Sequence, residues 1–215
     1  MARLPGSAGA PVRPPLQMPA ATVAVHPWPD SRHLLATASD AGPDLIVISV
    51  VTPDSTLRDP ARAQLRSALR EVLGLQLDRA PEALILISAP GQALRLDFPG
   101  QRIGLSGSHE AGLSVAAICQ HGPVGIDIMR VAPAFDWQAM ARDYLGPQAS
   151  CRIASQPGHE QPQAFAREWT RLEAGLKCLG IGLQEWNPSL AQRLESCHLM
   201  ALDMPSGLCG AVAYR

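Results

Sequence analysis

Two oppositely charged side chains, Glu173 and Lys177, stand four residues apart in a segment with the pattern of an amphipathic helix. Residues at this spacing lie on one helix face, so a carboxylate and an ammonium group can share a site there. A structural salt bridge on a solvated helix is the simplest interpretation of such a pair. Lys177 is, however, the only lysine among the 18 Lys and Arg residues of the chain. This composition favours a specific requirement for an ammonium group at position 177.

A second acidic residue, Asp127, lies between Ile126 and Ile128 in an apolar segment. Burial of a carboxylate is unfavourable unless it faces a cation, a metal ion or water. An acid at a solvated strand end is one interpretation. The other is a shared site with Glu173, because Mg²⁺ is often held by one or two carboxylates while water and substrate phosphates complete its shell.

Phosphate groups in such a site would need positively charged or hydrogen-bonding donors, and Arg62, His109 and Lys177 are the candidates. Arg62 is one of four arginines spaced four residues apart, Arg58, Arg62, Arg66 and Arg70. A solvated helix face would also explain this basic stripe, and His109 taken alone would be an ordinary surface histidine.

The helix that carries Glu173 and Lys177 is predicted from apolar residues at alternating steps of four and three. They are Phe165, Trp169, Leu172, Leu176 and Leu179, and Gly180 and Gly182 are expected to end the helix. A second helix is predicted from Asp59-Pro60 to Gly74, with proline in its first turn. A third is expected over 136–145, and a loop over 146–162.

Apolar and β-branched runs bounded by Gly, Pro and Asp predict the strands. They cover 22–26, 45–51, 83–88, 93–98, 113–119, 124–128, 198–203 and 208–214. We expect 83–88 with 93–98, and 198–203 with 208–214, to form hairpins, and 113–119 to neighbour 124–128 through a turn at 121–123. Both halves combine strands with a long helix, which predicts an α+β fold of two similar lobes, each a small, mainly antiparallel sheet packed against a helix.

The chain of 215 residues is long enough for two such lobes. We place the N-terminal lobe at 21–100 and the C-terminal lobe at 101–215, after a flexible tail rich in Pro, Ala and Gly at 1–20. A formal net charge of −1 argues against a nucleic-acid partner. The five cysteines have no CxxC spacing and an odd count, so we expect reduced thiols. No signal peptide or membrane span is evident, and a cytoplasmic protein is expected.

Four motifs, in order and at the right spacing between Asp59 and Leu183, resemble those of the 4'-phosphopantetheinyl transferase superfamily, in particular its longer, pseudodimeric type that includes the surfactin-synthetase activator. Arg62 stands where the family has an arginine in its first long helix. Ser108-His109 matches a Ser-His motif, and Gly125-Ile126-Asp127 a Gly-x-Asp motif. The fourth motif is Trp169-x-x-x-Glu173-Ala174-x-x-Lys177.

The resemblance implies an enzyme that moves the 4'-phosphopantetheine group of coenzyme A to a serine of an apo acyl or peptidyl carrier protein, releasing 3',5'-ADP. Coenzyme A would contact Arg62, Ser108, His109 and Lys177, and Mg²⁺ would bind Asp127 and Glu173. The implied catalytic residues are Glu173, Lys177 and His109, with Glu173 as the base for the serine proton. A monomer without nucleic-acid or membrane partners is expected.

Several positions depart from the family's pattern. Met129 replaces a frequent second acid, Leu172 a lysine, Ser106 an asparagine, and Gln92-Ala93 the last two residues of a Gly-Lys-Pro loop. Two alternatives therefore stay open. The first is a non-catalytic or weakened relative that binds coenzyme A or a carrier protein, and the second is an α+β protein whose charged pairs are only structural.

Overall fold

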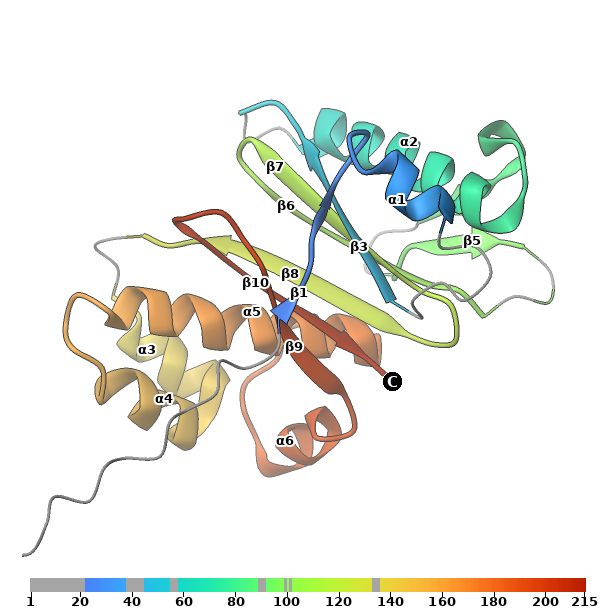
Figure 1. Ribbon diagram of the computed structural model, residues 1–215. Helices are drawn as coiled ribbons and strands as arrows, with labels where there is room; N and C mark the ends of the chain where they lie inside the picture. Colours follow the sequence, from blue (N-terminus) through green and yellow to red (C-terminus); the bar gives the residue numbers. More distant parts are fainter. Residues whose placement is uncertain are drawn as a thin grey trace, which may run out of the picture.

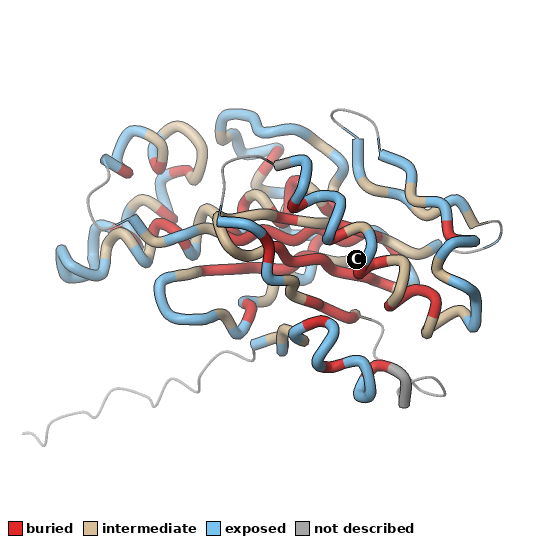
Figure 2. Tube along the Cα trace, turned by 90° about the horizontal axis from the view of Figure 1, so that it is seen from above, coloured by how far each residue is buried: buried red, intermediate tan, exposed pale blue. Residues whose placement is uncertain are grey.

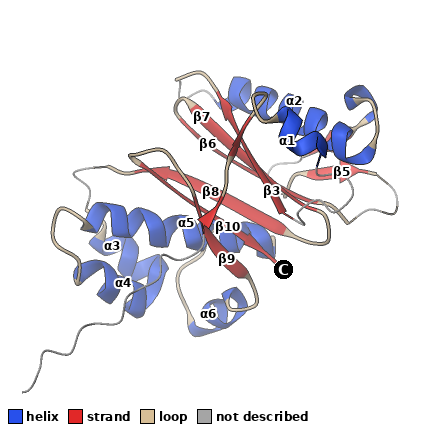
Figure 3. Ribbon diagram, in the orientation of Figure 1, coloured by secondary structure: helices blue, strands red, loops and turns tan. Residues whose placement is uncertain are grey.

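The structure, a computed structural model, describes residues 22–37, 45–54, 58–88, 92–98, 100, 102–132 and 136–215. The predicted tail at 1–20 and the turn of the first predicted hairpin at 89–91 lie outside these residues. The described part has a mixed α+β fold with two β-sheets (Figure 3).

The larger sheet has six strands in the order β2-β3-β7-β6-β5-β4. They are β2 (His26–Pro27), β3 (Leu45–Val51), β4 (Ile85–Ile87), β5 (Arg95–Asp97), β6 (Gly104–Glu110) and β7 (Leu113–Cys119). All neighbouring pairs are antiparallel except β2 with β3. The predicted hairpin of 83–88 and 93–98 is confirmed in its paired core, β4 with β5.

The smaller sheet has four strands in the order β1-β9-β10-β8. They are β1 (Thr22–Val23), β8 (Val124–Arg130), β9 (His198–Leu202) and β10 (Leu208–Tyr214). The predicted C-terminal hairpin is confirmed as the antiparallel pair β9 and β10, and β10 pairs with β8 on its other side. β1 runs parallel to β9, so the short segment from β1 to β2 passes from one sheet to the other.

The helices are α1 (Arg32–Thr37), α2 (Arg58–Leu77), α3 (Gln138–Met140), α4 (Gly146–Ala154), α5 (Gln161–Leu179) and α6 (Pro188–Leu194). A 3-10 turn, η1 (Pro81–Ala83), follows α2, and a wider π-type turn, η2 (Ala141–Leu145), joins α3 to α4. The long helices α2 and α5 cover the outer faces of the two sheets, so that the order of layers is α2, six-stranded sheet, four-stranded sheet, α5 (Figure 1).

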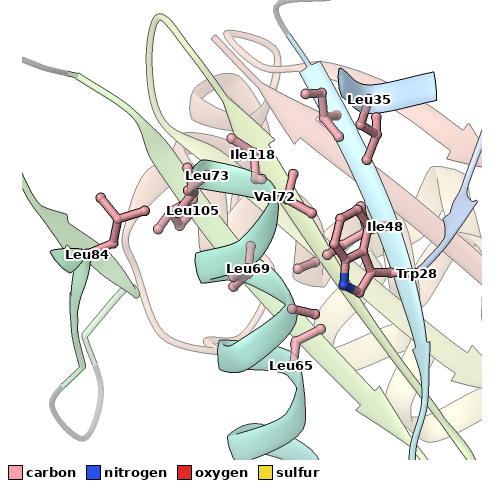
Figure 4. Close-up of a cluster of buried hydrophobic side chains, with 13 residues drawn as sticks. Trp28, Leu35, Ile48, Leu65, Leu69, Val72, Leu73, Leu84, Leu105 and Ile118 are labelled. Atoms are coloured by element: carbon pink, nitrogen blue, oxygen red, sulfur yellow. The ribbon is translucent and has the colours of Figure 1, made fainter. Parts of the chain in front are cut away.

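Side chains alternate between the two faces of each strand, so apolar residues of one strand can fill the spaces on both sides of its sheet. On β3, Ile46 and Ile48 face α2, whereas Val47 faces the smaller sheet. Figure 4 shows Ile48 and Ile118 beneath the apolar face of α2. Between the sheets lie Val47, Val115, Ala117, Cys119, Val124, Ile126, Ile128, Leu202 and Val212. The buried strands therefore run through the middle of the molecule, as Figure 2 shows.

β8 lies against β6 across the junction of the two sheets, and side-chain atoms bridge the two strands. The Ser106 Oγ accepts from the backbone N–H of Ile126 at 3.1 Å, and the Glu110 Oε1 accepts from that of Arg130 at 3.1 Å. The expected neighbours 113–119 and 124–128 do pack against each other, but they do so as strands of different sheets and not as hydrogen-bonded partners. The sequence showed two adjacent apolar strands, but apolar strands can pack face to face as well as pair edge to edge.

Three helical features differ from the sequence-based expectations. Residues 146–162 were expected to be a loop because of their Gly, Pro, Ser and Gln content, but α4 forms there and buries Ala149 and Ile153. α2 continues three residues beyond Gly74, and the short helix α6 was not predicted. In each segment burial of apolar side chains outweighs weak helix propensity.

The division expected at residue 100 is not a boundary between sheets. β6 and β7 follow it in the chain, yet they pair with β5 and β3 of the six-stranded sheet. The similarity of the two lobes as a pseudodimer therefore stays a proposal. None of the helices in the described ranges combines the length and apolarity that crossing a bilayer requires.

The contact between α5 and β8 depends on Gly125. A Cβ atom there would lie 2.0 Å from the Ala174 carbonyl oxygen and 2.5 Å from the Cys178 nitrogen. We expect Gly125→Ala to lower the free energy of unfolding by about 1–3 kcal/mol or more, because the helix backbone would have to move away from the strand. Urea denaturation measures this, with Gly158→Ala as the control because that position opens to free space. Equal stability of the two variants would contradict the prediction.

All five cysteines are free thiols, as expected from the sequence, and Cys151 is exposed whereas the other four are buried. Burial, with Cys197 nearby, raises the pKa of Cys178 to about 12. We therefore expect one fast-reacting thiol in the native protein and four slow ones, measured with a colorimetric thiol reagent before and after unfolding. Loss of the fast phase in Cys151→Ser identifies it. A second fast thiol in that variant would contradict the burial of the others.

Candidate functional site

The ion pair between Lys177 and Asp127 lies where α5 crosses β8. The Lys177 Nζ donates to Asp127 Oδ1 at 2.8 Å and to the Ile126 carbonyl oxygen at 2.9 Å. Alternation places Gly125 and Asp127 on the α5 side of β8, while Ile126 and its even-numbered neighbours face the other sheet. The missing side chain at Gly125 lets α5 come close enough for Lys177 to reach the strand. The Asp127 carboxylate thus faces the Lys177 ammonium group, a pairing that the sequence did not predict.

Glu173 lies one turn before Lys177 on α5 and close to the same ion pair. Burial raises the pKa of Glu173, the neighbouring charge of Asp127 raises it further, and Lys177 lowers it. Two carboxyl groups that repel each other in this way share one site. The salt bridge between Glu173 and Lys177 that the sequence suggests is therefore incomplete as an interpretation, because the Lys177 ammonium forms its ion pair with Asp127.

Ser108 contacts the same carboxylate from the opposite strand. The Ser108 Oγ donates to Asp127 Oδ1 at 2.8 Å and accepts from the Ile128 N–H at 3.3 Å. The serine is buried, with 7% of its surface exposed. The structure therefore places its hydroxyl on a protein carboxylate at the junction of β6 and β8.

A cavity of about 850 Å³ opens between α2 and the C-terminal end of α5. The basic residues that line it are Arg62, Arg66, His109 and Lys177. The Nδ1 atom of His109 lies 2.8 Å from the Ser114 Oγ, which fixes the imidazole ring at the cavity wall. Gly180 ends α5 with a positive φ of 66°, so the chain turns and runs along the cavity as far as Gly182. The site therefore draws on both sheets and both long helices.

The structure brings most of the predicted residues together. Arg62, His109 and Lys177 share the cavity, and Lys177 connects it to Asp127 and Glu173. Ser108, Asp127 and Glu173 do not line the cavity itself. Because Lys177 reaches from the cavity wall to Asp127, the acidic pair adjoins the cavity at that lysine.

Arg66 was seen in the sequence only as part of a basic stripe. In the structure it lines the cavity one turn after Arg62, and its guanidinium group donates to the Ser88 hydroxyl. The fourfold spacing of the arginines was the available signal. It could not tell which of them face the cavity, because that depends on how α2 is rotated on the sheet.

The residues that depart from the family's pattern have packing roles. Leu172 is buried with Leu176 and Leu190, where α5 meets α6. Met129 packs against a cluster that contains Trp137, Phe165 and Ile153. An ionised side chain in either position would enter an apolar contact region, where its burial is unfavourable.

The acidic pair has the donor chemistry of a divalent-cation site. Ser108 and Lys177 both bond to Asp127 Oδ1, and no hydrogen bond from the described residues reaches Oδ2. Asp127 thus has one oxygen for a metal ion, and Glu173 adds a second carboxylate beside it. No group of three or more His, Cys, Asp or Glu residues suited to a metal ion occurs in the described ranges. A cation here would need water or substrate oxygens as further ligands.

Comparison with known proteins supports the family resemblance. Residues 123–200 match the sequence model of the 4'-phosphopantetheinyl transferase superfamily. The chain is 27% identical over 120 residues to a protein of Synechocystis sp. provisionally named 4'-phosphopantetheinyl transferase slr0495, a match that covers 55% of this chain and 49% of that protein. It is 28% identical over 134 residues to the 4'-phosphopantetheinyl transferase HetI of Nostoc sp., covering 57% and 51%.

The matches thus span about half the length of these relatives. The matched segment 123–200 contains Asp127, Glu173 and Lys177, the charged residues that meet where α5 crosses β8. Through that segment, the chain is similar to the 4'-phosphopantetheinyl transferase superfamily.

Proposed function

We propose that this protein transfers the 4'-phosphopantetheine group of coenzyme A to a serine of an apo acyl or peptidyl carrier protein and releases 3',5'-ADP. The observation that carries the proposal is the convergence of basic side chains in one cavity that adjoins a pair of carboxyl groups through Lys177. Coenzyme A carries a pyrophosphate and a separate 3'-phosphate. A cavity with basic residues at both of its helix walls suits a ligand with two such anionic groups.

The position of the acidic pair, which adjoins the cavity at Lys177, determines the orientation that we propose for coenzyme A. The pyrophosphate is the reacting group and belongs beside Lys177 and His109, close to the carboxylates. The 3'-phosphate would then be bound by Arg62 and Arg66 of α2, which line the cavity. Arginine suits this role because its planar group can donate two parallel hydrogen bonds to phosphate oxygens.

Asp127 and Glu173 would hold Mg²⁺, with Oδ2 of Asp127 as one ligand. When bound, the ion neutralises negative charge on the pyrophosphate. Binding of the pyrophosphate would also recruit the Lys177 ammonium, which can donate to a phosphate oxygen as well as to Asp127. His109 supplies a further donor from the cavity wall.

The chemical step is attack by the carrier serine oxygen on the phosphorus atom that bears the pantetheine arm. A new P–O bond forms, the bond from that phosphorus to the bridging oxygen breaks, and 3',5'-ADP leaves with the electron pair. The serine proton passes to Glu173, directly or through water. Glu173 suits this role because its carboxyl group adjoins the Lys177–Asp127 ion pair, beside the proposed place of the pyrophosphate.

We also propose that the protein acts as a monomer in the cytoplasm. A weakened relative that binds coenzyme A or a carrier without efficient transfer is the second candidate. It is favoured by the burial of Leu172 and the packing of Met129, which leave the site with fewer charged groups than the family's pattern has.

One assay separates these functions. The protein is incubated with fluorescent coenzyme A, Mg²⁺ and a panel of apo carrier proteins, and label on the carrier is measured. Transfer supports the enzyme. Coenzyme A binding without transfer to any carrier supports the weakened relative, and the absence of both would leave the charged pairs as structural features.

Replacing either acid should remove transfer. We expect Asp127→Asn and Glu173→Gln each to lower the Mg²⁺-dependent rate by about 100-fold or more, because each change removes a carboxylate from the site that holds the ion and accepts the proton. The exposed Glu185 provides the control variant Glu185→Gln. The rate is followed with labelled coenzyme A, and full activity in either site variant would exclude the two-carboxylate site.

Arg66 should recognise the 3'-phosphate. We expect Arg66→Leu to weaken coenzyme A binding by about tenfold through loss of a charged hydrogen bond, while binding of 3'-dephospho-coenzyme A stays unchanged. Isothermal titration without divalent ions measures both. Arg70→Leu, one turn later and outside the cavity lining, is the matched control. A similar loss for both ligands would place Arg66 elsewhere along coenzyme A.

A further inference from the structure

A row of three side chains on β6 bridges to β8, and Ser108 is its middle member. Ser106, Ser108 and Glu110 each accept a hydrogen bond from a backbone N–H twenty residues later, at Ile126, Ile128 and Arg130. The constant offset means that β6 and β8 run side by side in parallel, although they belong to different sheets. Side-chain oxygens thus take the place of a backbone ladder at this junction.

Ser108 differs from the other two members of the row in making a second bond. Its hydroxyl donates to Asp127 Oδ1 at 2.8 Å while it accepts from the Ile128 N–H at 3.3 Å. A serine hydroxyl has one hydrogen to donate. Donation to a phosphate would therefore require Ser108 to release Asp127, and the residue does not line the coenzyme A cavity.

The two donors to Asp127 Oδ1 come from different elements and can act differently. Lys177 lines the cavity on a long, flexible side chain, so it can turn toward a phosphate. Ser108 is short, buried and fixed by the β8 backbone. When Lys177 turns away, Ser108 remains to hold Oδ1 of the carboxylate, so that Oδ2 stays available to a cation.

We propose that Ser108 is a positioning residue that orients Asp127 for a divalent cation and makes no direct contact with coenzyme A. This inference rests on the proposed function, since it assigns Asp127 to the cation. It also gives a role to the junction of β6 and β8, because the contact between the sheets would hold the Asp127 carboxylate in position for the cation. Partners that orient a metal ligand commonly contribute about 10- to 100-fold to metal affinity.

The test uses Mn²⁺ alone as the probe, with binding measured by isothermal titration and by electron paramagnetic resonance of free Mn²⁺. We expect Ser108→Ala to lose about 10- to 100-fold in Mn²⁺ affinity, and Ser108→Thr, which keeps the hydroxyl, to retain most of it. Ser106→Ala is the matched control, because it removes the same type of bond one pair earlier without touching Asp127. Thermal unfolding checks that each variant is folded.

A second measurement separates positioning from substrate contact. Without divalent ions, Ser108→Ala should bind coenzyme A as the wild type does, whereas His109→Ala should bind it more weakly because His109 lines the cavity. A loss of coenzyme A affinity in Ser108→Ala under these conditions would overturn the proposal in favour of direct contact.

The remaining outcomes test the positioning role separately from the proposed function. Wild-type Mn²⁺ affinity in Ser108→Ala, or an equal loss in Ser106→Ala, would overturn the positioning role even if the wild type transfers phosphopantetheine. Conversely, a selective loss of Mn²⁺ affinity in Ser108→Ala, in a protein that transfers nothing to any carrier, would support the positioning role and refute the proposed function. The two failures are therefore distinguishable.

Discussion

The close packing of α5 on β8 is the constraint on which the candidate site depends. At Gly125 there is no room for a side chain between strand and helix, so the two backbones meet. The Lys177 side chain then spans a short gap to Asp127, and Glu173, one turn away, is brought close enough for the two acids to affect each other. A partly buried ion pair is retained here at a cost in desolvation, which is more easily explained by function than by stability.

The four layers of the fold surround the contact between α5 and β8. The face of β8 that carries Asp127 packs on α5, while its other face forms the apolar core between the sheets. β6 approaches from the second sheet and contributes Ser108 to the same carboxylate. On its other side, β6 presents His109 to the cavity beneath α2. β6 therefore contacts Asp127 through Ser108 on one face and contributes His109 to the cavity on the other, because successive side chains of a strand point to opposite faces.

Met129 and Leu172 place apolar side chains beside the charged residues of the candidate site. Each belongs to an apolar cluster, one with Trp137 and Phe165 and the other with Leu176 and Leu190. Apolar surroundings lower the effective dielectric around Asp127, Glu173 and Lys177, and this strengthens interactions among the charges that remain. All three of these charged residues lie within the segment 123–200, which is similar to the superfamily.

The sequence by itself determined the helix of Glu173 and Lys177, most of the strands and the set of charged candidates, because period-3.6 and period-two patterns and the rarity of lysine are local properties. It did not determine that β7 and β8 lie in different sheets, that α4 replaces an expected loop, or that Arg66 faces the cavity. Nor could it show that Ser108 bonds to Asp127, nineteen residues later. Those facts depend on which apolar faces pack together and on the rotation of each element, and only tertiary packing decides them.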